Sequence, residues 1–324
     1  MYHLDAHVAE AIRTDDRRIV ITGAGGWLGL ATLELLCNAI GEDFAARVVC
    51  FGSRARTLEL RDGTGVSQRP IGEIGDLVYK PSIVLHLAYL TKDRAEHMTP
   101  EAYRAANRAL SSIVLDALEA IGAIGVFLPS SGAASVADLP TASEAMRAYG
   151  LLKRDDEEGF ATWAEKDDSR LAVIARIFNV SGPYINKPEA YALSAFIRDA
   201  LKGQPVHVKA KRRVVRSFVA IRELMSIVFA LLLGDTRGAV RFDTGAEEEL
   251  EMRELADSIA NLAGNGKMIA EDIDINLPPD IYVGDQTAYE VWRHSSRVGK
   301  VPFSVQVKET AAYLANSDIL GKAA

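Results

Sequence analysis

The sequence has little cysteine, no excess of positive charge and no long apolar run. Its two cysteines, Cys37 and Cys50, show neither a disulfide framework nor the spacing of metal ligands, which favours the reducing cytoplasm. The formal net charge is −7, whereas a nucleic-acid-binding protein usually carries a basic surface. The most apolar run, residues 224–234, is about half the length of a membrane-spanning helix. We therefore expect a buried helix there, a cytoplasmic protein, and neither nucleic acid nor membrane as a partner.

The first half of the chain alternates short apolar runs with longer helical patterns. Such β-α-β alternation predicts an α/β protein with a Rossmann-type, doubly wound parallel sheet. The composition agrees, because 48% hydrophobic and 25% charged residues are typical of a globular protein with a core. The expected strands are residues 17–23, 47–54, 81–90, 125–132 and 169–182.

The helical and strand patterns loosen after about Gly182, where prolines 183, 188 and 205 interrupt them. We expect two regions. Residues 1–180 form a domain that binds NAD or NADP, and residues 181–324 form a smaller substrate-binding region, with some segments returning to the first sheet.

A glycine-rich turn joins the first expected strand to the helix that follows. Gly23, Gly26 and Gly29 form a G-x-x-G-x-x-G pattern. In a dinucleotide site the first glycine allows a tight turn, the second lets the backbone approach the pyrophosphate, and the third lets the helix pack closely. The helix N-terminus then offers free N–H groups to the phosphates. The alternative is that the three glycines belong to an ordinary strand-to-helix turn. Because a strand precedes the glycine pattern and a helix follows it, we prefer the prediction of a dinucleotide site.

The second strand ends without a carboxylate. NAD sites usually place Asp or Glu there to bind the adenosine ribose, but this strand ends in Gly52, Ser53 and Arg54, with Arg56 close behind. Because an arginine can bind a 2′-phosphate, we predict NADP as the preferred cofactor. If Arg54 is instead a solvated loop residue, either NADP or NAD can bind.

Tyr149 and Lys153 are four residues apart in an expected helix and therefore share one face. A tyrosine with its usual pKa of ~10 is a poor base at neutral pH, and a nearby ammonium lowers that pKa. The pair is then either a proton-transfer unit or two residues on a solvated helix face.

The order of these motifs resembles the extended short-chain dehydrogenase/reductase family, and within it the nucleotide-sugar epimerase/dehydratase/reductase branch. The motifs are Gly23-x-x-Gly26-x-x-Gly29, His86-Leu87-Ala88, Ser130-Ser131-Gly132, Tyr149-x-x-x-Lys153 and residues 176–183. The resemblance implies that Ser131, rather than Ser130, holds the sugar oxygen. It also implies that Tyr149 moves the proton while Lys153 bonds the nicotinamide ribose.

The resemblance further implies the binding residues. For the cofactor these are Gly23, Gly26, Trp27, Leu28, Gly29, Ser53, Arg54, Leu87, Ala88, Asn107, Tyr149, Lys153 and Phe178, and for the sugar diphosphate Ser131, Asn179 and Arg216. Arginine suits the last role because its planar fork binds phosphate with two hydrogen bonds. Residues 211–213 are expected at an exposed hairpin tip.

Several reactions are disfavoured by what the chain lacks. The related dehydratases and decarboxylases carry carboxylates just after the catalytic serine, where this chain has Gly132 and Ala133. No G-x-S-x-G or H-E-x-x-H pattern indicates a serine hydrolase or a metal enzyme, and His86 is expected to be a core or cofactor-lining residue. An NADPH-dependent 4-keto-sugar reductase remains the preferred prediction. The alternatives are a 4-epimerase that retains NAD and, third, a dinucleotide sensor or scaffold without turnover.

The helices that hold Asn107 and Tyr149 pair across a two-fold axis in the resembled family, which predicts a homodimer. The nucleotide base and the sugar are not predicted.

Overall fold

The computed structural model describes residues 2–90, 98–140, 142–246 and 248–316. The chain forms two compact units. Unit 1 comprises Met1–Ile177 and Met225–Phe242, and unit 2 comprises Phe178–Leu224 and Asp243–Ala324.

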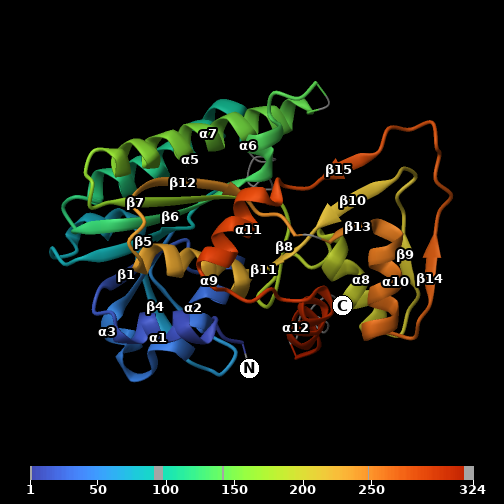
Figure 1. Cartoon of the computed structure of the whole chain (residues 1–324), viewed down its shortest axis with the longest axis horizontal. Coiled ribbons are helices and arrows are strands. Elements are labelled where there is room, and N and C mark those ends of the chain that lie inside the picture. The colour runs from blue at the N-terminus through green and yellow to red at the C-terminus, as the bar shows by residue number, and fades with distance from the viewer. Residues whose placement is uncertain (1, 91–97, 141, 247, 317–324) are drawn as a thin grey trace. The chain divides into compact units, whose positions relative to one another are not determined.

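Unit 1 is built on an eight-stranded sheet with the order β12-β7-β6-β5-β1-β2-β4-β3 (Figure 1). Its strands are β1 (Arg18–Thr22), β2 (Val48–Gly52), β3 (Arg56–Glu59), β4 (Gly65–Pro70), β5 (Ser82–His86), β6 (Ala123–Ser131), β7 (Leu171–Ile177) and β12 (Gly238–Asp243). The pairs from β4 through β2, β1, β5 and β6 to β7 are parallel, and β3 runs antiparallel to β4. The predicted mostly parallel α/β fold is therefore confirmed.

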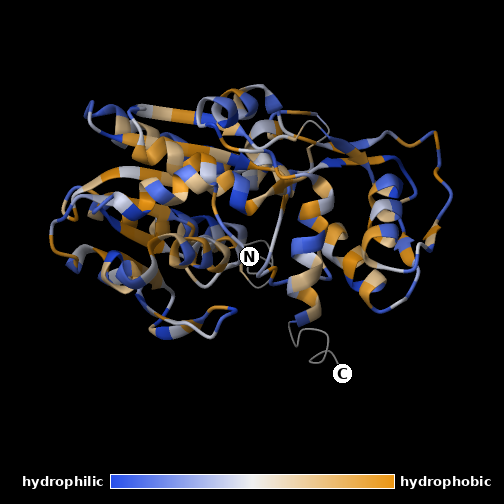
Figure 2. Ribbon diagram, turned by 60° about the horizontal axis from the view of Figure 1, so that its bottom comes forward, coloured by the Kyte–Doolittle hydropathy of each residue, from blue (hydrophilic) through white to orange (hydrophobic). Residues whose placement is uncertain are grey.

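Helices cover both faces of this sheet (Figure 1). On one face lie α1 (Ala6–Thr14), α2 (Trp27–Ile40) and α3 (Phe44–Arg47), and on the other lie α5 (Pro100–Ala117) and α7 (Glu144–Glu165). Every residue of β1 and β5 is buried, which explains their continuous apolar runs. Figure 2 shows hydrophobic residues along the strands of the large sheet and mixed hydropathy along the helices. The core on one side joins Val84, Val126 and Phe160.

The apolar run at residues 224–234 lies, except for its last residue, within α9 (Ile221–Leu233), a buried helix as expected. None of the helices in the described ranges is both long and apolar enough to cross a membrane.

Among the elements of unit 1 that the sequence patterns did not predict are α1 and the β3–β4 hairpin, and β12 was expected only as an unspecified later segment that returns to the sheet. The strands of the hairpin lie at the sheet edge, and only alternate side chains are buried. They therefore lack the continuous apolar run by which the central strands were found.

In its described residues, unit 2 contains small sheets and the four helices given below. A three-stranded sheet has the order β13 (Glu249–Glu251), β10 (Val214–Ser217), β15 (Asp280–Tyr282). Two-strand pairs join β8 (Val180–Ser181) to β11 (Val219–Ala220) and β9 (Val206–Val208) to β14 (Met268–Ala270). The helices are α8 (Ala192–Leu201), α10 (Met252–Ala263), α11 (Gln286–Ser295) and α12 (Phe303–Asn316).

Candidate active site

The glycine-rich turn follows β1 and requires glycine at two positions. Gly23 has φ +68°, and a Cβ atom there would lie 2.6 Å from Ala88 N. A Cβ atom at Gly29 would lie 2.5 Å from Ala24 O, so α2 packs against the backbone of the turn itself. Gly26 precedes α2 and has no side chain to cap it. The N-terminus of α2 therefore has no side-chain cap at Gly26, and a helix N-terminus favours an anionic ligand.

The turn lies where the strand order reverses, between β1 and β5. In doubly wound sheets this reversal creates the ligand-binding crevice at the carboxyl ends of the strands. Leu87 and Ala88 follow β5 directly and bond to Thr22 at the end of β1. The same edge carries Ser131 at the end of β6. These features fit the pyrophosphate and nicotinamide of a dinucleotide.

The end of β2 lacks a carboxylate, and an amide occupies its place. A Cβ atom at Gly52 would collide with the side-chain amide of Gln68 on β4. Gln68 Nε2 donates to Arg54 O at 2.8 Å, whereas its buried Oε1 has no hydrogen-bond partner among the described residues. Ser53 and Arg54 are exposed. The sequence did not predict that Gln68 lies here, because only the pairing of β4 with β2 brings its side chain to the end of β2.

Arg56, the first residue of β3, lies against the glycine-rich turn. A side chain at Gly25 would collide with its guanidinium group. Arg54 was predicted as a cofactor residue and Arg56 was not, but Arg56 is the arginine that the structure places on the turn.

The helix α7 brings Tyr149 and Lys153 to the end of β6. It begins after Ser143, whose side chain accepts a hydrogen bond from Met146 N at 3.2 Å. A Cβ atom at Gly150 would collide with the carbonyl oxygen of Ala133, so α7 packs directly on the short helix α6 (Gly132–Val136). Tyr149 and Lys153 therefore flank the strand end that carries Ser131.

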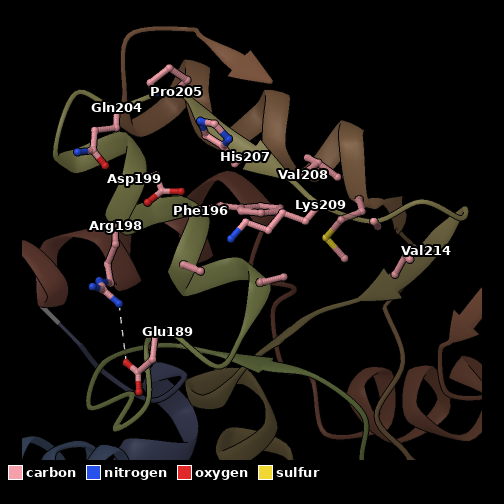
Figure 3. A pocket seen from close by; sticks show the side chains of 14 residues that line it. Glu189, Phe196, Arg198, Asp199, Gln204, Pro205, His207, Val208, Lys209 and Val214 are labelled. Carbon is pink, nitrogen blue, oxygen red and sulfur yellow. Dashed lines mark ion pairs between the residues drawn. The ribbon is translucent and has the colours of Figure 1, made fainter. Parts of the chain in front are cut away.

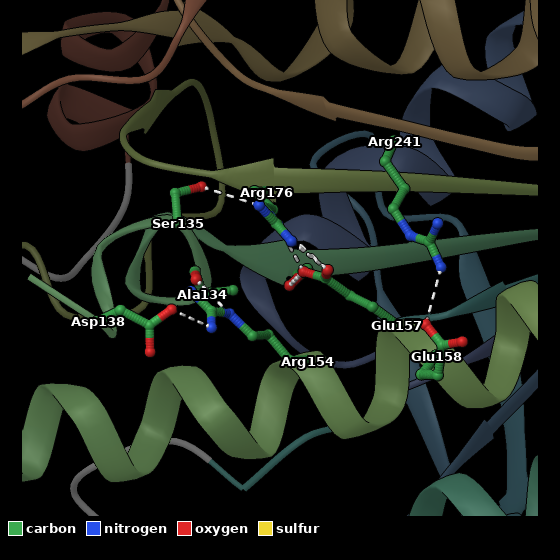
Figure 4. A network of polar contacts seen from close by, with 9 residues as sticks. Ala134, Ser135, Asp138, Arg154, Glu157, Glu158, Arg176 and Arg241 are labelled. Atoms are coloured by element: carbon green, nitrogen blue, oxygen red, sulfur yellow. Dashed lines mark hydrogen bonds and ion pairs between the residues drawn. The ribbon is translucent and has the colours of Figure 1, made fainter.

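The two adjacent serines have different environments. Ser131 caps α6 by accepting from Ala133 N at 3.2 Å, and it remains partly exposed with a proton to donate. Ser130 is buried and donates to Glu157 on α7. Glu157 in turn forms a two-pronged ion pair with Arg176 on β7, at 2.7 and 2.9 Å (Figure 4). Ser130 is thus bound within the protein, whereas Ser131 can meet a ligand.

Lys153 is only 4% exposed. Its Nζ atom donates to Pro129 O at 3.3 Å and lies 3.4 Å from the centroid of the Tyr89 ring. Burial lowers the pKa of this amine to about 8, although Asp156 and Glu157 oppose the shift. Tyr149 lies four residues earlier on α7 and therefore shares a helix face with Lys153.

His86 is a buried histidine at the end of β5. Its Nδ1 atom lies 2.8 Å from Thr22 Oγ1. Burial, with a smaller contribution from Lys153, lowers its pKa to about 3, so the ring is neutral. No group of three or more potential metal-ligating side chains occurs among the residues that the structure describes.

Asn107 on α5 supports the segment after β5. Its Oδ1 accepts from Leu90 N at 2.8 Å, and its Nδ2 donates to Tyr103 O at 3.2 Å. Its amide therefore holds backbone, and the predicted contact with the cofactor stays a prediction.

The remaining predicted residues belong to unit 2. Asn179 Nδ2 donates to Ser217 O at 3.1 Å. The Phe178 and Tyr282 rings contact each other at a tilt of 44°, with a centroid distance of 4.7 Å, and the guanidinium of Arg216 lies 5.8 Å from the Tyr282 ring. Arg216 also pairs with Asp280 at 3.0 Å. Their roles toward cofactor and substrate stay predictions.

The segment 211–213 is exposed, as expected, but it is not a hairpin tip. It joins β9 to β10, which belong to different sheets. The sequence shows two short strands around a polar segment, but it does not show that β9 pairs with β14 and that β10 pairs with β13 and β15.

Unit 2 also contains a pocket of about 860 Å³ between α8 and β9 (Figure 3). Sequence patterns did not indicate it, because its walls come from separate segments. Figure 3 shows Phe196, His207 and Lys209 on its wall. Arg198 pairs with Glu189 at 3.8 Å on another side.

Residues 19–240 match the family model described as the NAD dependent epimerase/dehydratase family. The chain belongs to this family. It is an enzyme of the extended short-chain dehydrogenase/reductase class, and the predicted resemblance is confirmed.

Solved structures share this fold over nearly their whole length. The UDP-N-acetylglucosamine 4-epimerase of Methanobrevibacter ruminantium has a TM-score of 0.72 and 17% identity, covering 93% of this chain and 99% of that one. The UDP-glucose 4-epimerase of Thermus thermophilus, solved with NAD, has a TM-score of 0.67 and 19% identity, covering 93% and 99%. At such identities the likeness concerns the fold alone.

Among curated proteins, UDP-glucuronic acid decarboxylase 6 of Arabidopsis thaliana is 32% identical over 104 residues. The match covers 32% of this chain and only 28% of that protein.

Proposed function

We propose that this enzyme reduces a 4-keto sugar carried on a nucleoside diphosphate, with NADPH as the hydride donor. The observation that carries the proposal is the convergence of Ser131, Tyr149 and Lys153 at the sheet edge that also holds the glycine-rich turn. A hydroxyl donor, a phenol and an ammonium beside a dinucleotide site suit hydride transfer to a carbonyl.

Each of these side chains has one task. A dinucleotide bound at this edge would supply the hydride. Ser131 donates a hydrogen bond to the sugar carbonyl oxygen, which polarises the carbon for attack. Tyr149 gives its phenolic proton to that oxygen, so the product is an alcohol. Lys153 stabilises the phenolate that remains until solvent returns the proton.

The end of β2 supports NADP over NAD. Gln68 occupies the space that an Asp or Glu at position 52 would use, so no carboxylate repels a 2′-phosphate. Arg54 is exposed beside it and can pair with that phosphate.

For the substrate, we propose that the nucleotide half binds in the pocket of unit 2. Lys209 and His207 offer polar groups there, and Val214 of the pocket shares β10 with Arg216. The names of the structural relatives, which act on UDP-sugars, support a nucleotide sugar.

Decarboxylation, the activity in the name of the Arabidopsis relative, is not proposed. Gly132 and Ala133, the positions after Ser131, are buried in α6 and have no group that can move a proton.

A 4-epimerase with retained NAD is the second candidate. The structural relatives named above are 4-epimerases, and one was solved with NAD. The Oε1 of Gln68, which has no partner in the part of the chain that the structure describes, is also a neutral acceptor that suits a ribose 2′-hydroxyl. Purified protein that retains NAD and interconverts two nucleotide sugars without consuming NADPH would establish the epimerase instead.

The decisive experiment compares wild type with Tyr149→Phe on a panel of nucleotide 4-keto sugars. We expect NADPH consumption by wild type, a loss of at least about 10²-fold in kcat for the variant, and nearly unchanged NADPH affinity. Tight NADPH binding by wild type with no turnover of any nucleotide sugar would favour a sensor or scaffold.

We also propose a homodimer formed through α5 and α7. Ile113 on α5 and Leu151 on α7 are 36% and 45% exposed, and a partner subunit would cover them there.

A further inference from the structure

Tyr89 follows β5 by three residues and contacts both members of the proposed proton-transfer pair. The Lys153 Nζ atom lies 3.4 Å from the centroid of its ring. The Tyr149 ring meets it edge to face, with a centroid distance of 5.9 Å and an angle of 80°. Because β5 lies between β1 and β6, Tyr89 stands at the same edge of the sheet as the glycine-rich turn and Ser131.

The Tyr89 ring offers an aromatic face to a buried ammonium. Such a face attracts a cation, and the attraction strengthens where water is excluded. Pro129 O accepts one hydrogen bond from the same Nζ atom. The ring and the carbonyl oxygen together hold the ammonium against the face of Tyr89, at the end of β6.

The Tyr89 hydroxyl oxygen, in contrast, is buried and unpaired within the described part of the chain. A buried hydroxyl without a partner is unfavourable, so a ligand that supplies an acceptor is favoured. Burial raises the pKa of this phenol above its usual value, and nearby Asp156 and Tyr149 add smaller effects. The hydroxyl is therefore a neutral donor throughout the working pH range.

We propose that Tyr89 is a further cofactor-binding residue, whose hydroxyl donates a hydrogen bond to the nicotinamide riboside half of the dinucleotide while its ring holds the Lys153 ammonium. The inference rests on the proposed function, because it takes the ligand at this edge to be a nicotinamide dinucleotide. The ribose oxygens and the carboxamide oxygen are the acceptors in that half.

Tyr89→Phe tests the hydroxyl alone. Calorimetry should show an affinity for NADP⁺ that is about three- to tenfold weaker than in wild type, as expected for one lost hydrogen bond. Affinity for adenosine 2′,5′-bisphosphate, which lacks nicotinamide riboside, should be unchanged. Tyr79→Phe is the matched control, because Tyr79 is 74% exposed. Unchanged NADP⁺ affinity, or equal weakening of both ligands, would overturn the proposal.

Tyr89→Leu tests the ring, through the pH dependence of NADP⁺ binding. The groups that face Lys153 are Asp156 and Glu157 on α7, neutral His86 on β5, and Tyr149. Without the aromatic face the ammonium loses its proton more readily, so NADP⁺ affinity should begin to fall at a lower pH than in wild type. Tyr89→Phe, which keeps the ring, should retain the wild-type profile. Coincident profiles for wild type and Tyr89→Leu would overturn the role of the ring.

These binding measurements do not depend on sugar turnover. If the Tyr89 variants bind NADP⁺ with the wild-type affinity, this inference is refuted but the proposed function is not. If the Tyr89 variants weaken NADP⁺ binding but wild type turns over no nucleotide sugar, the proposed function is refuted and the role of Tyr89 in cofactor binding is supported. Wild-type protein that binds neither NADP⁺ nor NAD would overturn both.

Discussion

Lys153 is a charged group held where charge is unfavourable. Its pKa of about 8 lies below the usual value of 10.5 because the amine is buried. Between these pH values the unfolded chain binds more protons than the folded one, so stability rises with pH through this window. Below pH 8 the buried ammonium destabilises the fold by up to about 3 kcal/mol.

Lys153→Met should therefore stabilise the fold while abolishing turnover. The expected gain in the free energy of unfolding is about 1–3 kcal/mol at pH 7, because the contacts with Pro129 and Tyr89 are lost along with the charge. The gain should shrink as pH rises from 8 to 10. Urea unfolding across this pH range measures it, and a pH-independent loss of stability would contradict the expectation.

Substitutions of Arg54 and Arg56 should have different effects on the binding of NADPH and NADH. Arg54→Ser should weaken NADPH binding by about 10- to 100-fold and leave NADH binding unchanged, because only NADPH carries the 2′-phosphate. Arg56→Ser should weaken both cofactors alike, because its guanidinium lies on the glycine-rich turn at Gly25. Fluorescence titrations with both nucleotides give the four affinities. Equal losses of NADPH and NADH in Arg54→Ser would contradict the assignment of NADP.

At the level of elements, the turn between β1 and α2 depends on glycine for two reasons. Gly23 has a positive φ that a side chain disfavours, and its missing Cβ leaves room for Ala88 N at 2.6 Å. A backbone neighbour cannot move aside as a flexible side chain can, so strain spreads to β5.

Gly23→Ala should destabilise the fold by at least about 2 kcal/mol and strongly weaken dinucleotide binding. Gly72→Ala, in the short helical segment Ile71–Asp76, is the matched control, because no atom lies within 4 Å of the added Cβ and its φ is not positive. Thermal unfolding and cofactor titration of both variants test this. Comparable behaviour of Gly23→Ala and Gly72→Ala would refute the steric explanation.

The elements differ in how far their sequences predicted them. β1 and β5 are buried on both faces, so their apolar runs predicted strands directly. β3 and β4 lie at the edge of the sheet, where half of the side chains face solvent and the pattern fades. β12 comes from a distant segment, and nothing local predicts which strand it will join.

For the whole molecule, dimerisation is the testable consequence of the exposed apolar residues on α5 and α7. A double variant, Ile113→Glu with Leu151→Glu, should convert a dimer into a monomer, because it would bury two unpaired charges at the interface. Ile275→Glu is the control, since Ile275 is 90% exposed in unit 2. Light scattering at micromolar concentration measures the mass. A monomeric wild type would exclude the dimer.

Most of the predictions came from local sequence patterns and from the order of the motifs along the chain. The α/β fold and the shared helix face of Tyr149 and Lys153 followed from local patterns, because strand burial, turn geometry and the helical repeat are short-range constraints. The choice of Ser131 and the roles of the three residues followed from the resemblance of the ordered motifs to a family. Contacts between distant segments needed the folded chain. Only there does Gln68 occupy the empty space at Gly52, Arg56 lie on Gly25, and the Tyr89 ring meet Lys153. Such contacts depend on strand pairing and helix packing, which place residues far apart in sequence within a few ångströms and leave no local trace.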